Sequence, residues 1–235
     1  VKEPQPQELE FLNSSHVLFG YLHLSSNLSL TKALLDKKLT GIATEMIMDG
    51  KEYPLLIPMS KIAGKLAVQK GMQFLEYSSK GKGLLLSAIS EQKSSVVTVI
   101  GCGEVGRASI QKSIQIGASV IAIDVNEDTL EDLKNKYGEN ISTLVGGTEE
   151  AINAIRSADL VIGAVLLPGR KPPVVVTEED INAMEKGTVI IDVAIDQGGC
   201  VESVKPNTHS EPFEIRNGVI VSAIANLPGA VPRTS

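Results

Sequence analysis

The stretch that most constrains the fold of this chain is residues 96–106, VVTVIGCGEVG. A β-branched run leads directly into Gly-x-Gly-x-x-Gly, the pattern by which a buried strand turns sharply into a helix. Gly101 allows the tight turn, Gly103 lets a phosphate approach the backbone, and Gly106 lets the helix pack closely on the strand. The first amides of that helix carry positive partial charge. The stretch therefore predicts a strand-turn-helix unit that binds the pyrophosphate of a dinucleotide.

The residues after the glycines extend this unit to β-α-β. Apolar residues recur at helical spacing over 105–116, Gly117 follows as the expected cap, and a second apolar strand ends on Asp124. Asp124 lies 23 residues after Gly101, where a carboxylate accepts hydrogen bonds from the adenosine ribose and repels a 2′-phosphate. The predicted cofactor is therefore NAD rather than NADP. The alternative interpretation is an ordinary β-α-β turn with a surface aspartate.

Strands and helices continue to alternate toward the C-terminus. Further strands are predicted at 141–145, 160–165, 188–193 and 218–221, and helices at 126–137, 148–155 and 177–184. This alternation is typical of an α/β fold with a doubly wound parallel sheet, the Rossmann fold, which we assign to residues 94–235. Residues 200–214 are rich in turn formers and are interpreted as a long surface excursion.

The N-terminal part predicts a second, smaller α/β unit. A buried strand is expected at 17–22, a helix at 28–35 and another strand at 41–47. His23 stands where the first strand ends, and ligands gather at the carboxyl ends of strands in open α/β sheets. His23 is therefore a candidate functional residue. The alternative is that its role is structural. The predicted domains are a partial α/β domain at 1–58, a linking helix and linker at 59–93, and the Rossmann domain at 94–235.

Composition and charge argue against several classes of protein. The net charge of −6 gives no basic field for nucleic acid, and four Phe, four Tyr and no Trp leave little for base stacking. No apolar run approaches the ~20 residues that span a bilayer, so we expect no membrane segment. Cys102 and Cys200 are far apart and have no metal-ligand spacing. We therefore expect reduced thiols, no metal site and a cytoplasmic protein.

Several stretches together resemble the alanine dehydrogenase family, which is related to the nucleotide-binding subunit of the transhydrogenases. They are residues 1–4 (VKEP), 21–24 (YLHL), 58–60 (PMS), 158–165 (ADLVIGAV), 191–199 (IDVAIDQGG) and 225–235 (ANLPGAVPRTS). The resemblance covers nearly the whole chain, and IDQGG and PGAVPRTS are its most specific motifs. Because the transhydrogenase relatives usually lack the histidine and the DQGG motif, the resemblance favours the dehydrogenase branch.

The resemblance implies NAD-dependent, reversible oxidative deamination of L-alanine to pyruvate and ammonia. It implies His23 and Asp196 as acid/base residues, Lys2 as a partner of the substrate's carbonyl or carboxylate, and a homo-oligomer, a hexamer by resemblance. Ser60 would lie near the nicotinamide. The other implied cofactor contacts are Gly101, Gly103, Val105, Gly106, Asp124, Val165, Val193, Ile195 and Asn226.

An alternative function stays open. In the resembled family the substrate domain begins well before the equivalent of Val1 and supplies an arginine for the substrate carboxylate, and a further helix follows the equivalent of Ser235. We therefore expect this chain to be a segment of a longer protein or a trimmed one. The alternative to the enzyme is a non-catalytic NAD-binding module, either a truncated or decayed dehydrogenase or a transhydrogenase-like domain. No residue in the sequence distinguishes alanine from glycine or serine as the substrate.

Overall fold

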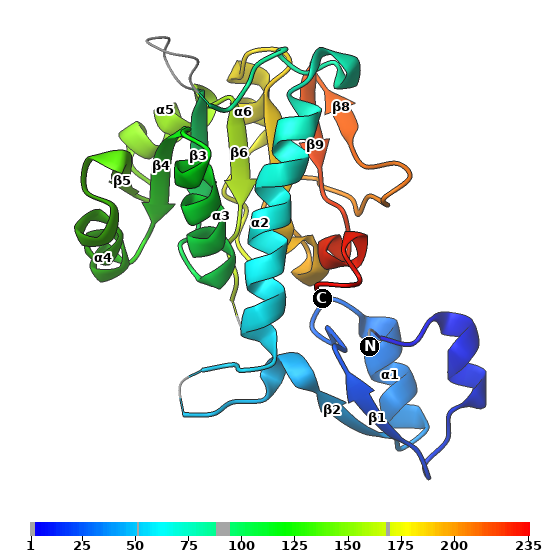
Figure 1. Cartoon of the computed structure of the whole chain (residues 1–235). Helices are drawn as coiled ribbons and strands as arrows, with labels where there is room; N and C mark the ends of the chain where they lie inside the picture. The colour runs from blue at the N-terminus through cyan, green and yellow to red at the C-terminus, as the bar shows by residue number, and fades with distance from the viewer. Residues whose placement is uncertain (1–2, 51, 88–94, 168–169) are drawn as a thin grey trace.

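The computed structural model describes residues 3–50, 52–87, 95–167 and 170–235, which form two sheets of unequal size (Figure 1). The larger sheet has seven strands in the order β5-β4-β3-β6-β7-β9-β8. Their bounds are β3 Val96–Ile100, β4 Ser119–Asp124, β5 Ile141–Val145, β6 Leu160–Gly163, β7 Val189–Asp192, β8 Glu214–Arg216 and β9 Val219–Ser222. All neighbours are parallel except β8 and β9. The strand order reverses beside β3, so the predicted doubly wound sheet is confirmed.

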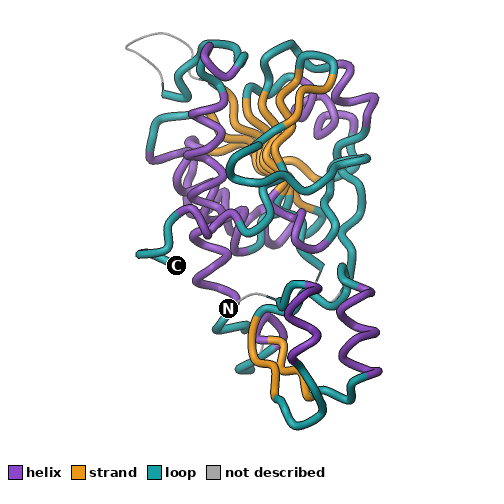
Figure 2. Tube along the Cα trace, turned by 90° about the vertical axis from the view of Figure 1, so that its right-hand side faces the viewer, coloured by secondary structure: helices purple, strands orange, loops and turns teal. Residues whose placement is uncertain are grey.

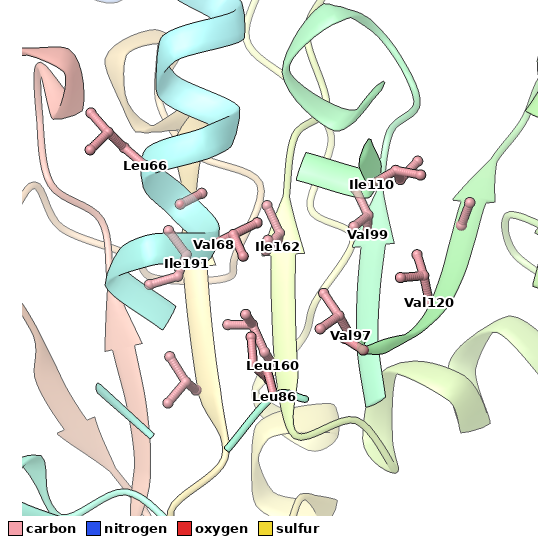
Figure 3. Close-up of a cluster of buried hydrophobic side chains, with 14 of the residues drawn as sticks. Leu66, Val68, Leu86, Val97, Val99, Ile110, Val120, Leu160, Ile162 and Ile191 are labelled. Atoms are coloured by element: carbon pink, nitrogen blue, oxygen red, sulfur yellow. The ribbon is translucent and has the colours of Figure 1, made fainter. Parts of the chain in front are cut away.

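Helices cover both faces of this sheet. One core contains side chains from the helices α2, α3 and α4, and a second core contains side chains from α5 and α6. The helix bounds are α2 Leu56–Phe74, α3 Glu104–Gln115, α4 Glu127–Tyr137, α5 Glu149–Arg156 and α6 Glu178–Ala183. Figure 3 shows the first core, where Val68 of α2 lies beside Ile162 of β6, and Val97 and Val99 of β3 belong to the same cluster. The burial of these β-branched and leucine side chains removes apolar surface from water and stabilises the sheet between its two helical layers.

Helix α2 runs from the small sheet to the large one, and most of its length packs on the large sheet (Figure 1). Two glycines allow this close packing. A Cβ added at Gly64 would overlap the carbonyl oxygen of Val105, and one at Gly71 would lie 2.5 Å from Leu160 Cδ2. The backbone of α2 therefore approaches α3 and β6 more closely than a larger residue would permit.

The smaller sheet has two parallel strands, β1 (Val17–Gly20) and β2 (Thr40–Ala43), joined by α1 (Leu28–Asp36). Figure 2 shows the two sheets at opposite ends of the molecule. The prediction of a buried strand over 17–22 is wrong in length and in burial: Val17 is 62% exposed and Phe19 is 56% exposed. The reason is that α1 covers only one face of the two strands. The second strand also ends early, at Ala43.

Other differences lie at the edges of the predicted elements. The excursion predicted at 200–214 leads into β8, a short edge strand whose three residues are too few to show a period. The strands predicted at 160–165 and 188–193 stop at Gly163 and Asp192. The short 3-10 turns are η1 Pro6–Phe11, η2 Thr44–Met46, η3 Tyr77–Ser79, η4 Gly138–Asn140, η5 Val193–Gln197 and η6 Leu227–Ala230. Within the described ranges, no helix has both the length and the apolarity to cross a bilayer.

Candidate active site

The glycine-rich turn joins β3 to α3 at the point where the strand order reverses. Gly101 has a φ of +90°, and a Cβ added there would lie 2.7 Å from the carbonyl oxygen of Ala164. A Cβ at Gly106 would overlap the carbonyl oxygen of Gly101, whereas one at Gly103 would meet no described atom within 4 Å. Two glycines therefore permit tight backbone packing, and Gly103 leaves open space in front of the α3 N-terminus. Such a cradle fits a pyrophosphate.

Asp124 lies at the carboxyl end of the neighbouring strand, β4. Its Oδ2 accepts a hydrogen bond of 2.6 Å from the Cys102 amide, and its Oδ1 accepts one of 2.9 Å from the Asn126 amide. The carboxylate is thereby fixed beside the glycine turn. A carboxylate has about four acceptor positions, so further positions remain for the hydroxyls of a ribose.

Asp196 lies in the turn η5, which follows directly from the end of β7. The turn closes on Gly198, with a φ of +105°, and Gly199, with a φ of +76°. Asp196 Oδ1 accepts a 3.2 Å hydrogen bond from the amide of Asn226, a residue with a φ of +54° at the start of η6. Two segments from the carboxyl edge of the large sheet thus meet at this carboxylate.

His23 comes from the small sheet, three residues after β1 ends. Its φ is +45°, an uncommon conformation for a residue other than glycine. The buried Glu45 holds it there: Glu45 Oε1 accepts a 2.7 Å hydrogen bond from the His23 amide, and both carboxylate oxygens lie 3.2 Å from the Leu22 amide. The imidazole Nδ1 lies 3.3 Å from Glu3 Oε2, and its ring is stacked near Tyr21. Backbone, ring edge and ring face are therefore each held by a neighbour.

The ring of Tyr21 lies beside the imidazole ring of His23. Its hydroxyl donates a 2.6 Å hydrogen bond to the carbonyl oxygen of Leu55, just before α2. Burial, and secondarily the negative charge of Glu45, raises the pKa of Tyr21. The phenol is therefore a neutral donor near neutral pH.

Ser26 connects the two parts of the site. Its hydroxyl oxygen lies 3.0 Å from the carbonyl oxygen of His23 and 2.8 Å from the carbonyl oxygen of Asp196. The single hydroxyl proton thus has one acceptor on each side of the cleft. The contact brings together segments that belong to different sheets.

A cavity of about 570 Å³ lies between these segments. Six of the residues implied by the resemblance line it, namely His23, Ser60, Val105, Val193, Asp196 and Asn226. A second cavity, of about 360 Å³, also has His23 and Gln197 in its wall and extends toward Glu45. The two candidate acid/base residues therefore line one cavity.

The remaining implied residues lie elsewhere. Gly101, Gly103, Gly106 and Asp124 lie at the glycine turn, and the amide of Val165 packs against Gly101. The side chain of Ile195 is buried beneath its own turn, where a Cβ added at Gly199 would lie 3.5 Å from its Cδ1. Lys2 lies outside the described residues. Sequence reasoning missed Glu45, although a single acidic residue inside the apolar run 41–47 was a usable signal, and it missed Ser26, for which no local signal exists.

Both cysteines are free thiols with buried side chains. Burial, and then the charge of Asp124, raises the pKa of Cys102 from 9.0 to about 12. Burial, and then the charge of Asp192, raises the pKa of Cys200 well above its usual value. Neither thiol is therefore suited to act as a nucleophile.

Comparisons with known proteins point to one family along the whole chain. Residues 67–235 match the family described as "Alanine dehydrogenase/PNT, C-terminal domain", and residues 1–63 match "Alanine dehydrogenase/PNT, N-terminal domain". The alanine dehydrogenase of Bacillus subtilis (strain 168) is 47% identical over 236 residues, which are 100% of this chain and 62% of the relative. The alanine dehydrogenase of Methanococcus maripaludis is 44% identical over 237 residues, which are 100% of this chain and 64% of that protein.

Solved structures of related proteins superpose on nearly the whole chain. An L-alanine dehydrogenase superposes with a TM-score of 0.88 at 40% identity, over 99% of this chain and 65% of the other. A transhydrogenase from Sinorhizobium meliloti superposes with a TM-score of 0.78 at 22% identity, over 99% of this chain and 68% of the other, and shows a shared fold. The chain spans a little under two thirds of the length of the curated relatives it matches.

Proposed function

The chain belongs to the alanine dehydrogenase/PNT family, and we propose that it carries out the NAD-dependent, reversible oxidative deamination of L-alanine to pyruvate and ammonia. The observation that carries the proposal is that His23 and Asp196 line one cavity although they come from different sheets. The names of the similar proteins support the same reaction. The chain spans less than two thirds of the length of these proteins. The proposal is therefore that this chain itself catalyses the reaction.

The glycine turn and Asp124 fit NAD. We assign the pyrophosphate to the amides around Gly101, Gly103 and Gly106 at the α3 N-terminus, where backbone N–H groups and the helix dipole favour an anion. We assign the adenosine ribose to Asp124, whose charge disfavours a 2′-phosphate. When bound, the nicotinamide supplies the hydride acceptor for the substrate's Cα–H bond.

His23 is assigned the proton transfers. After hydride loss the substrate is an iminium ion, which adds water and then collapses to pyruvate and ammonia. A side chain must remove a proton from the attacking water and return one to the departing nitrogen, and imidazole suits both steps near neutral pH. Because Glu3 lies against Nδ1, a proton on Nδ1 leaves Nε2 as the nitrogen that accepts.

Asp196 is assigned the electrostatic role. A carboxylate beside the cationic iminium stabilises its charge and orients the water that His23 deprotonates. The hydrogen bond from the Asn226 amide to Asp196 Oδ1 helps to fix the position of the carboxylate. The substrate's own carboxylate or carbonyl is assigned to Lys2 by the resemblance alone.

The second candidate is a non-catalytic NAD-binding module. It is favoured by one observation: the glycine turn and Asp124 both lie in the large sheet, whereas the chain spans only 62% of the Bacillus subtilis relative. A module of this kind binds dinucleotide with the same residues and has no turnover.

Turnover separates the two candidates. NADH formation is measured with L-alanine and NAD at mildly alkaline pH, and calorimetry measures NAD binding to the same preparation. We expect turnover that falls at least about 100-fold in His23→Ala and is unchanged in His16→Ala, an exposed histidine outside the cavity. NAD binding without turnover in the wild-type chain would support the binding module. Light scattering on the same sample tests the expected homo-oligomer.

A further inference from the structure

A buried carboxylate lies directly beneath the Asp196 turn. Asp192 is the last residue of β7 and is 1% exposed. Its Oδ1 accepts a 2.9 Å hydrogen bond from the Ala194 amide, and its Oδ2 accepts hydrogen bonds of 2.8 Å from the Cys200 amide and 3.0 Å from the Val201 amide. One side chain therefore joins the beginning of the loop 193–199 to the residues just after its end.

The neighbouring residues leave room for this arrangement. A Cβ added at Gly163, which pairs with Asp192 across the sheet, would lie 2.5 Å from the sulfur of Cys200. A Cβ added at Gly199 would lie 2.9 Å from Asp192 Oδ2 and would overlap Val204, at a φ of +76°. The glycines at both positions thus permit the close approach of the carboxylate to the loop.

An ionised carboxylate is costly to bury unless its oxygens are hydrogen-bonded. Burial raises the pKa of Asp192, and the amides of Val201, Cys200 and Ala194 oppose that rise. Cys200 Sγ lies 3.5 Å from Oδ1 and is a further donor. Three backbone amides and a thiol therefore hold the carboxylate in one place, and the loop is held with it.

We propose that Asp192 is a positioning residue, which holds the loop 193–199 so that Asp196 faces His23 and the nicotinamide. Asp192 does not itself line the cavity, whereas Val193 and Asp196 do. A displacement of about 1 Å in a reacting group costs about 100-fold in rate, so the fixed ends of this short loop matter to the reaction. The proposal rests on the proposed function for its effect on rate, but its effect on binding is measured separately.

The direct variant is Asp192→Asn. The amide keeps the shape of the carboxylate, but one of its two ends is a donor. In either orientation that donor faces backbone N–H groups, either that of Ala194 or those of Cys200 and Val201. One end of the loop is therefore released. Amide hydrogen exchange is expected to speed up over 193–201 and to stay slow in β7.

Two ligands then report on the two halves of the cofactor site. ADP-ribose contains the adenosine and pyrophosphate parts of NAD and lacks the nicotinamide. In Asp192→Asn we expect the Kd of NAD to rise about tenfold, which corresponds to the loss of about one hydrogen bond. The Kd of ADP-ribose is expected to stay within about twofold of the wild-type value. Turnover, where the wild-type chain has it, is expected to fall about 100-fold.

Asp180→Asn is the matched control. Asp180 is also buried, at 6% exposed, and accepts hydrogen bonds from the Thr177 amide and the Arg156 guanidinium at the start of α6, outside both cavities. A purely structural role for Asp192 predicts the same loss of stability in both variants and no change in the ratio of the two Kd values. That result would overturn the proposal.

A further variant covers the case in which Asp192→Asn does not fold. Gly199→Ala keeps the carboxylate and displaces the loop, and we expect the same selective loss of NAD affinity. An unchanged ratio of Kd values in this variant would contradict the proposal. A wild-type chain that binds NAD without turnover would refute the proposed reaction and leave this binding comparison intact.

Discussion

The hydroxyl of Ser26 lies 2.8 Å from the carbonyl oxygen of Asp196, a residue 170 positions away in the chain. The same hydroxyl lies 3.0 Å from the carbonyl oxygen of His23. It is therefore a direct link between the turn that carries the candidate acid/base histidine and the turn that carries the candidate carboxylate. Because each carbonyl belongs to a different side of the cleft, the proton of Ser26 keeps an acceptor if the two sides move apart.

Ser26→Ala removes this link. If the cost of losing this hydrogen bond, about 0.5–1.5 kcal/mol, falls on the closed arrangement of the site, kcat/KM decreases about two- to thirteenfold with little change in the free energy of unfolding. Steady-state kinetics and urea unfolding measure the two quantities. Ser29→Ala is the control, because Ser29 is also exposed and donates only to Asn27 among the contacts described. Equal kinetics in the two variants would exclude a role for the Ser26 contact.

Glu45 is predicted to hold His23 in its left-handed conformation. Glu45 is 6% exposed and accepts from the amides of Leu22 and His23. Glu45→Ala leaves these amides without their acceptor, which predicts a loss of about 1–3 kcal/mol in the free energy of unfolding and a lower kcat. Urea denaturation measures the first effect. The exposed Glu52 provides the control variant Glu52→Ala, and an equal stability of both variants would refute this role.

The glycine turn predicts opposite outcomes for two alanine variants. Gly103 has a φ of −71° and open space where a side chain would project, so Gly103→Ala folds normally but places a methyl group where the pyrophosphate is assigned. Gly106→Ala instead overlaps the carbonyl oxygen of Gly101 and destabilises the fold. Calorimetry is expected to show at least about a tenfold loss of NAD affinity in Gly103→Ala. Normal NAD affinity there would contradict the assignment.

The buried thiols predict a loss of stability at alkaline pH. The pKa of Cys102 is about 12 in the folded chain and has an ordinary value of 9.0, and that of Cys200 is also raised. Above pH 9 the unfolded chain has lost thiol protons that the folded chain retains. The free energy of unfolding therefore falls as pH rises from 9 toward 12. Urea unfolding at several pH values measures the decrease, and Cys102→Ala is expected to reduce it.

Sequence reasoning was most successful where the signal is local. The glycines at 101, 103 and 106, the helix after them and the strand ending at Asp124 all lie within one short stretch, and the structure confirms each element. Burial was predicted wrongly where it depends on partners that are distant in the sequence. Val17 and Phe19 have the composition of a buried strand, yet no described element covers their face.

The contacts that build the site were beyond sequence reasoning for a related reason. Hydrogen bonds such as those from Ser26 to Asp196 and from His23 to Glu45 join segments whose spacing no periodicity records. Asp192 lies inside the strand predicted at 188–193, and nothing in the sequence shows that its carboxylate faces the amides of Cys200 and Val201. The domain limits at 58 and 93, the role of Lys2 and the hexamer stay predictions.

The most direct test of the proposed reaction uses L-alanine that carries deuterium at Cα. The chain is incubated with this substrate and NAD, and the mass of the NADH formed is measured. The account predicts one deuterium in each NADH, because the hydride passes directly from Cα to the nicotinamide in the cavity lined by His23 and Asp196. NADH without deuterium, or NAD that binds and is not reduced, would contradict it.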